Sequence, residues 1–254
     1  MKRALPLLVA LLLLTGCFEI DQTLRLEKNL SGTADFHLGV NFEPMVTIMA
    51  QFAHDMEGKK GPLTAADIEK AKADFRKNAK KSSSEKPSLA EMKKSMPEGI
   101  ELLDFKAKES DFRIDSDFKF GFRKLQNLVS VKLPSKEGGD PTQKNVVDTP
   151  FDGLEVVEKG DTITIRTKPV NPAEAVKEEA KDAPKMDAAA EKLMRDAFKD
   201  LRVTYRITAP FTVVSHNATR REGNTLVWEY TMDRFEELSK KSADELGVRV
   251  TYRR

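Results

Sequence analysis

Two stretches near the start of this chain alternate strictly between apolar and polar residues, and they constrain its fold more than any other feature. Residues 18–26 carry apolar side chains at nearly every even position, and residues 34–42 repeat the pattern. A period of two is typical of a half-buried β-strand. The stretch Lys28-Asn29-Leu30-Ser31-Gly32 lies between them, and its Asn and Gly tolerate the positive φ of a turn. The sequence therefore predicts a β-hairpin here.

The same alternation returns later in the chain. It predicts a second hairpin over residues 100–120, a third over 154–167, and final strands within 201–214, 226–230 and 248–252.

Residues 43–96 have helical periodicity instead. Met45, Ile48, Met49, Phe52 and Met56 recur at the spacing of one helix face. A second helix is predicted from Thr64 to about Lys80, opened by Thr64 and Asp67, and a short third one opened by Ser88 and Glu91. We interpret the segment as a helical insertion between two pieces of sheet.

The fold class indicated by these patterns is α+β. We expect antiparallel hairpins in one main sheet, with the helices of 43–96 and 185–199 packed on one face. Residues 169–184 are rich in Pro, Ala, Lys and Glu and are predicted to be a charged linker. The whole of 17–254 is expected to be a single domain.

The first sixteen residues have a different character. Lys2 and Arg3 precede an almost continuous apolar run over residues 4–14, and small residues then lead to Cys17. A basic start, an apolar stretch of about ten residues and a small-residue cleavage site are typical of a secretory signal peptide. A transmembrane helix needs about 20 apolar residues, which this run does not reach. Residues 1–16 are therefore predicted to be a signal peptide.

The ending Leu14-Thr15-Gly16-Cys17 resembles the lipobox of bacterial lipoproteins. The resemblance implies cleavage before Cys17 and acylation of that cysteine, with chains such as palmitate, so that the mature protein is anchored to a membrane by lipid. Phe18 stands where an Asp would resemble the inner-membrane retention signal of Gram-negative lipoproteins. This favours the outer membrane, facing the periplasm, in a host with two membranes.

The charge balance excludes one class of partner. Of the 43 Lys and Arg residues, Lys2 and Arg3 lie in the signal segment, so the remainder equals the 41 Asp and Glu residues. A nucleic-acid partner would require a clustered basic face, and none is expected. Membrane attachment then depends on the acyl chains. With Cys17 as the only cysteine, no disulfide can form within the chain.

No catalytic or metal-binding signature stands out. His37, His54 and His216 lack the spacing of zinc ligands and are interpreted as solvated surface histidines. Ser215 and His216 are adjacent on a predicted strand end and so point apart, and no nucleophile elbow is present. We therefore predict no catalytic residue, no metal and no cofactor, and expect a protein that is not an enzyme.

The Met-rich helix is a candidate binding face. Met45, Met49, Phe52 and Met56 share one side and could contact a hydrophobic ligand or partner, since Met side chains repack easily. The alternative is ordinary core packing against the sheet, which we favour because apolar stripes at this spacing are the norm in globular helices.

The stretches Pro210–Ala218 and Thr225–Tyr230 are similar to the LppM-type lipoprotein domain, whose strands also run into an Asn turn and a Trp-bearing strand. The resemblance implies an envelope protein that contacts lipids or other envelope components and has no enzymatic activity. Three functions follow as hypotheses. They are an envelope lipoprotein with a binding or structural role, a carrier of lipid or another hydrophobic ligand, and an envelope hydrolase of unrecognised type.

Overall fold

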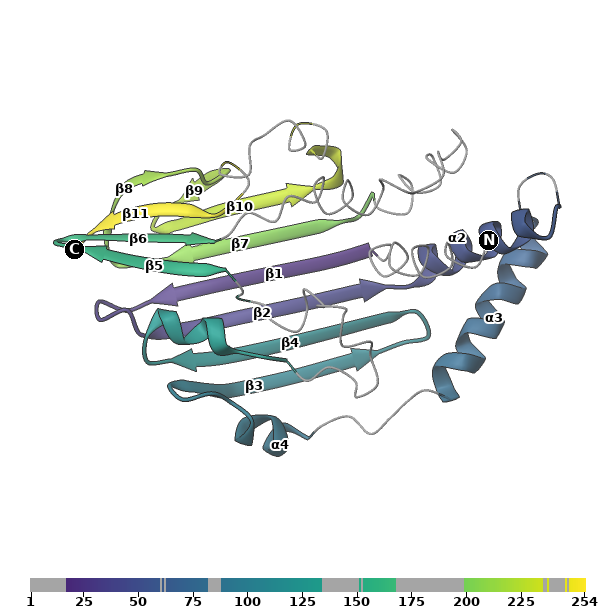
Figure 1. Cartoon of the computed structure of the whole chain (residues 1–254), viewed down its shortest axis with the longest axis horizontal. Helices are drawn as coiled ribbons and strands as arrows, with labels where there is room; N and C mark the ends of the chain where they lie inside the picture. The colour runs from purple at the N-terminus through teal and green to yellow at the C-terminus, as the bar shows by residue number, and fades with distance from the viewer. Residues whose placement is uncertain are drawn as a thin grey trace.

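The chain folds into two β-sheets and a set of short helices, as the computed structural model in Figure 1 shows. The structure describes residues 17–59, 61, 63–81, 88–133, 151, 153–167, 199–234, 237, 245 and 247–254. The strands are β1 (Cys17–Leu26), β2 (Gly32–Asn41), β3 (Ile100–Glu109), β4 (Arg113–Phe122), β5 (Leu154–Lys159), β6 (Thr162–Thr167), β7 (Arg202–Thr208), β8 (Thr212–His216), β9 (Arg220–Glu222), β10 (Thr225–Thr231) and β11 (Arg249–Arg253). Seven strands form one sheet in the order β3-β4-β2-β1-β7-β10-β9, and four form another in the order β5-β6-β11-β8.

The first predicted hairpin is confirmed. β1 and β2 pair antiparallel along their whole length, from Cys17 opposite Asn41 to Leu26 opposite Gly32. Gly32 has no room for a side chain, because a Cβ there would lie 1.9 Å from the backbone oxygen of Arg25. The hairpins β3–β4 and β5–β6 also pair as their alternation predicts.

Two features of the sheets differ from the expectation of one antiparallel sheet. β1 pairs with β7 in parallel, from Glu19 opposite Arg202 to Arg25 opposite Thr208. The prediction of a single main sheet is wrong, because β5, β6, β8 and β11 form a sheet of their own. The physical reason is that the apolar face of the large sheet needs a cover, and the apolar residues of these four strands provide it.

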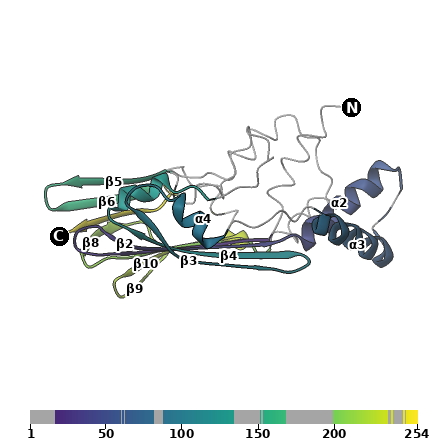
Figure 2. The same ribbon diagram turned by 90° about the horizontal axis from the view of Figure 1, so that it is seen from below.

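The hydrophobic core lies where the two sheets stack, as the view in Figure 2 indicates. Phe120 and Leu226 of the large sheet and Ile163, Ile165 and Tyr252 of the small one are fully buried. The 3-10 helix η1 (Leu125–Ser130) adds further buried leucines to the same core, and a second one, η2 (Met232–Arg234), follows β10.

Asn217 links the two sheets through its side-chain amide. Its Oδ1 accepts hydrogen bonds from Trp228 Nε1 at 2.7 Å and from the backbone nitrogen of Arg249 at 2.8 Å. Its Nδ2 donates to the backbone oxygen of Gly247 at 2.7 Å. One side chain thus connects β10 of the large sheet with the segment that enters β11 of the small one.

Between β2 and β3 the chain forms α2 (Glu43–Met56), α3 (Ala65–Lys81) and α4 (Leu89–Lys94). The predicted helix starts are confirmed by their caps. Thr64 and Asp67 exchange hydrogen bonds ahead of α3, and Ser88 and Glu91 form a complete capping box ahead of α4.

The placement of these helices differs from the expectation that they cover a face of the sheet. α2 and α3 extend past one end of the large sheet, whereas α4 lies beside β3 (Figures 1 and 2). The position of α2 and α3 follows from packed aromatic rings at that end of the sheet. Phe75 of α3 lies between Phe42 and Phe112, with ring centroids 5.9 and 5.7 Å away.

The predicted signal segment 1–16, the linker 169–184 and, apart from Lys199, the helix 185–199 lie outside the described residues. Within the described part of the chain, no helix combines the length and the apolar composition needed to cross a membrane.

Candidate functional site

Cys17, the residue expected to carry the lipid, is the first residue of β1. β1 is an inner strand of the large sheet, paired with β2 on one side and β7 on the other. No linker of described residues separates Cys17 from the sheet. A lipid at this position would therefore hold the sheet itself at the membrane surface.

The Met-rich stripe of α2 lies at the same end of the sheet as Cys17. Asn41 is the register partner of Cys17, and α2 begins two residues after Asn41. Val46 and Ile48, near the start of the helix, are buried. Further along, Met49 is 46% exposed and Met56 is 76% exposed.

Met45 and Phe52 of the stripe are half-buried. The second half of the stripe is therefore not packed in the way that the core-packing alternative requires. Whether the stripe binds a ligand or a partner stays a prediction.

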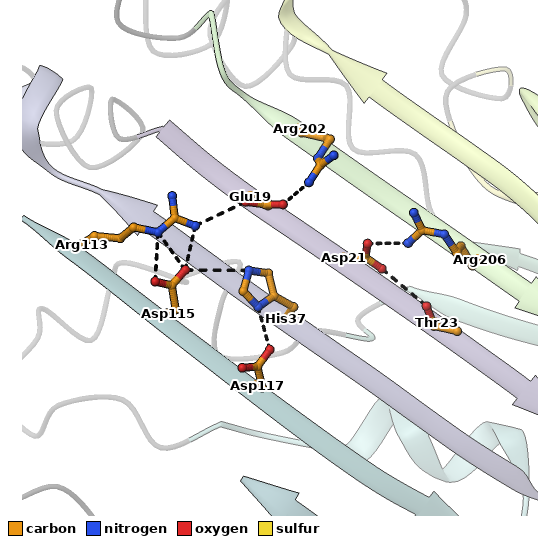
Figure 3. A network of polar contacts seen from close by, with 9 residues as sticks. All are labelled: Glu19, Asp21, Thr23, His37, Arg113, Asp115, Asp117, Arg202 and Arg206. Atoms are coloured by element: carbon orange, nitrogen blue, oxygen red, sulfur yellow. Dashed lines mark hydrogen bonds and ion pairs between the residues drawn. The ribbon is translucent and has the colours of Figure 1, made fainter. Parts of the chain in front are cut away.

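A network of charged side chains lies on the outer face of the large sheet, which points away from the core. It is close to the end of the sheet at which β1 begins (Figure 3). Glu19 of β1 lies between two guanidinium groups. Arg202 of β7 donates to one carboxylate oxygen of Glu19, and Arg113 of β4 approaches the other at 3.3 Å. Arg113 also pairs with Asp115, its Nη2 lying 2.7 Å from Oδ1. On the next row Arg206 pairs with Asp21.

Gly39 makes the bridge across β2 sterically possible. It lies between Glu19 and Asp115 in the cross-strand register. A Cβ at this position would come within 2.9 Å of Arg113 Nη2 and 3.1 Å of Asp115 Oδ1. The missing side chain lets the guanidinium of Arg113 lie over β2 and reach β1.

The ion pairs of this network shift the pKa values of the residues that form them. The hydrogen bond from Arg202 lowers the pKa of Glu19, and the hydrogen bonds from Arg113 lower the pKa of Asp115. The same contacts raise the pKa values of both arginines. The network therefore favours the charged forms of all four groups at neutral pH.

His37 and His54 are less solvated than the sequence suggested, whereas His216 is exposed as predicted. His37 Nδ1 lies 2.7 Å from Asp117 and its Nε2 lies 3.9 Å from Asp115. The side chain of His54 is only 12% exposed, because α2 packs against α3, so the prediction of a solvated residue is wrong there. His216 is exposed on β8 beside exposed Ser215, and its Nδ1 accepts from the backbone nitrogen of Ala218. Among the described residues, no group of His, Cys, Asp or Glu has the geometry of a metal site.

Sequence reasoning did not find the outer-face network as a candidate site. Its glutamate, aspartates and arginines were visible as the polar half of each alternating strand. Their pairing depends on β1 lying between β2 and β7, and no local pattern in the sequence carries that information.

Comparisons with known proteins give little further information. The chain matches no protein-family model and no curated protein. Among solved structures, it is similar to the folded domain of the lipoprotein LppM of Mycobacterium tuberculosis, determined by NMR, with a TM-score of 0.45 and 10% sequence identity. The similarity covers 93% of this chain and 90% of that domain. At this score the likeness carries no conclusion about function.

Proposed function

We propose that this protein is a lipoprotein of the bacterial cell envelope that acts by binding or structural support and not by catalysis. One observation carries the proposal. The cysteine expected to become the first residue of the mature chain is also the first residue of β1. The lipidation motif and the start of the folded domain thus coincide at one residue.

The geometry gives the anchor a specific consequence. β1 pairs on both sides within a few residues of Cys17, since Phe18 pairs with Val40 and Glu19 pairs with Arg202. A lipid on Cys17 would hold the domain close to the bilayer. A short attachment of this kind suits a protein that works at the membrane surface, and we propose the periplasmic face of the outer membrane.

The absence of catalysis is part of the proposal. The charged groups nearest the anchor are engaged with one another. Glu19 accepts from two arginines, and Asp115 is held by Arg113. Carboxylates with lowered pKa values, fixed in ion pairs, are poor general bases near neutral pH.

Metabolic labelling with an alkyne fatty acid tests the anchor. We expect the wild-type protein to be labelled, and the Cys17→Ser variant to lose the label. The matched control is Cys17→Ser combined with Val214→Cys, which restores one thiol at a site that is 49% exposed on β8. This control should stay unlabelled. Labelling of either variant would overturn the proposal.

A carrier of hydrophobic ligand is the second candidate. It is favoured by the inner face of the large sheet, where Phe18, Ile20, Tyr205 and Tyr230 are only partly buried at the edge of the core. Native mass spectrometry of the mature Cys17→Ser protein separates the two functions. Co-purified lipid would favour the carrier. A clean protein mass, together with no uptake of a fluorescent fatty acid, would exclude it.

A further inference from the structure

Helix α2 presents uncovered apolar side chains at the end of the molecule where the chain would meet the membrane. Met56 is the most exposed large hydrophobic residue of the described chain, at 76%, and Met49 on the same stripe is 46% exposed. Phe52 lies between them on the helix face and is half-buried. An apolar face left open by the fold commonly marks an interaction site.

The position of α2 is set by the register of the first hairpin. Cys17 pairs with Asn41, and the next residue, Phe42, is the N-cap of α2. The helix therefore starts beside the residue that would carry the lipid. Its 14 residues span about 21 Å at the α-helical rise of 1.5 Å per residue. The stripe thus begins beside the anchor, and its far end at Met56 lies about 20 Å further along the helix.

The charges around the exposed end of α2 are mixed. Asp55 and Glu57 are followed by Lys59, whose Nζ forms an ion pair with Glu57 at 2.7 Å. A basic cluster that would select anionic lipid is not formed by these residues. The attraction of the stripe to a bilayer would therefore come from apolar contact with the boundary between headgroups and acyl chains.

We propose that Met49, Phe52 and Met56 insert into the surface of the membrane that carries Cys17, so that α2 is a second membrane contact of the protein. This inference rests on the proposed function, because the lipid anchor brings the helix to the bilayer. With one contact at Cys17 and another along α2, the sheet has a fixed orientation relative to the membrane. A lipid on Cys17 alone would leave it free to rotate.

A fluorescent label on α2 tests the contact in the mature lipidated protein. Ala53 is exposed next to the stripe, and after acylation of Cys17 an Ala53→Cys variant has one free thiol for an environment-sensitive probe such as NBD. The labelled protein is reconstituted into phosphatidylcholine vesicles with plain or brominated acyl chains. We expect blue-shifted emission, and at least about twofold quenching by the brominated chains, as for a side chain at the acyl boundary.

Replacing the two exposed methionines of the stripe by a polar residue provides the decisive comparison. Met49→Gln combined with Met56→Gln should abolish most of the quenching of the label at position 53. Both side chains are exposed, so these changes should leave the circular dichroism spectrum and the unfolding temperature unaltered. In the control pair, Val157→Gln and Val214→Gln, side chains that are 47% and 49% exposed on the small sheet are changed, and the quenching should persist.

Two kinds of failure can be told apart. If the protein does not float with the vesicles, the lipid anchor and hence the proposed function are wrong. If it floats but the label is no more quenched by brominated than by plain chains, the anchor stands and the α2 contact is refuted. Quenching that survives the Met49→Gln/Met56→Gln exchange also refutes it. Because the attraction is apolar, adding anionic lipid or 0.5 M salt should change the quenching little; strong dependence on either would contradict the mechanism.

Discussion

Glu19 is the residue at which three strands of the large sheet meet. Its carboxylate accepts from Arg202 on β7 and Arg113 on β4, across the gap that Gly39 leaves on β2. The three side chains are partly exposed, so solvent screens their attraction and each ion pair stabilises the fold only modestly. The effect of these ion pairs is therefore easier to measure in the pH dependence of the free energy of unfolding than in its value at one pH.

The Glu19→Gln variant should lose stability in a pH-dependent way. The folded protein lowers the pKa of Glu19, so the unfolded chain binds a proton more readily as the pH falls. The contribution is therefore fully present above the ordinary value of 4.5, and is lost as the pH falls through the lowered pKa. We expect the variant to be about 0.5–1 kcal/mol less stable at pH 7 and nearly equal to the parent at pH 3.

Urea unfolding of the mature chain with Cys17→Ser, from pH 3 to pH 7, measures this difference. Glu101→Gln, at an exposed site on β3, is the matched control and should give a pH-independent difference near zero. A Glu19→Gln penalty that is constant across the range would show that the ion pairs do not operate as described.

At the scale of single elements, local patterns were sufficient to predict most of what the structure contains. The hairpin of β1 and β2 follows from alternation on either side of a turn-forming stretch, although Leu30 and not a glycine takes the left-handed φ of 64° there. The capping box of α4 follows from Ser88 and Glu91. These features depend on residues close in the chain. The places at which the helices pack against the sheet were less predictable. α2 was expected to pack on the sheet, but Phe42, Phe75 and Phe112 fix the helical pair at the end of it.

The turn of the first hairpin should be intolerant of any side chain at Gly32. A Cβ would lie 1.9 Å from the backbone oxygen of Arg25, so the Gly32→Ala variant must displace the end of β1 or β2. We expect a loss of about 2–4 kcal/mol in the free energy of unfolding.

Gly121→Ala on β4 is the matched control, since its Cβ would make an ordinary contact with Leu103 at 3.6 Å. Its effect should stay within about 1 kcal/mol. Equal effects of the two substitutions in urea unfolding would contradict the close approach at Gly32.

At the scale of the whole molecule, long-range pairing separates what the sequence could predict from what it could not. Strand β7 was visible from its alternation, but its parallel partner β1 is remote, with Glu19 and Arg202 separated by 183 positions. Alternation records which face of a strand is buried and not which strand lies beside it. The second sheet and the outer-face network were missed for the same reason.

The hydrogen bonds of Asn217 should stabilise the packing of the two sheets against each other. Replacing Asn217 with Ala leaves the buried Nε1 of Trp228 without this acceptor and removes the hydrogen bond from the backbone nitrogen of Arg249 to Oδ1. We expect a loss of about 1–3 kcal/mol, because an unsatisfied buried donor carries its desolvation cost. Asn217→Asp keeps the acceptor and should lose less.

Trp228 is the only tryptophan, so its fluorescence reports directly on this junction. The Asn217→Ala variant should show a changed emission maximum in the native state and a lower midpoint of urea unfolding. Native spectra and midpoints that match the parent would show that the sheets are held together without this side chain.

The place of β1 inside the large sheet has a consequence for the order in which the chain can fold. β2 follows β1 within a few residues, so the hairpin can close as soon as both strands are available to pair. The other edge of β1 must wait for β7, whose first residue is Arg202. An unpaired strand edge is prone to wrong association, and pairing across such a separation is slow. Until β7 is present, the nascent domain thus exposes an open β1 edge that begins at Cys17, and we expect it to need protection from wrong association at that stage.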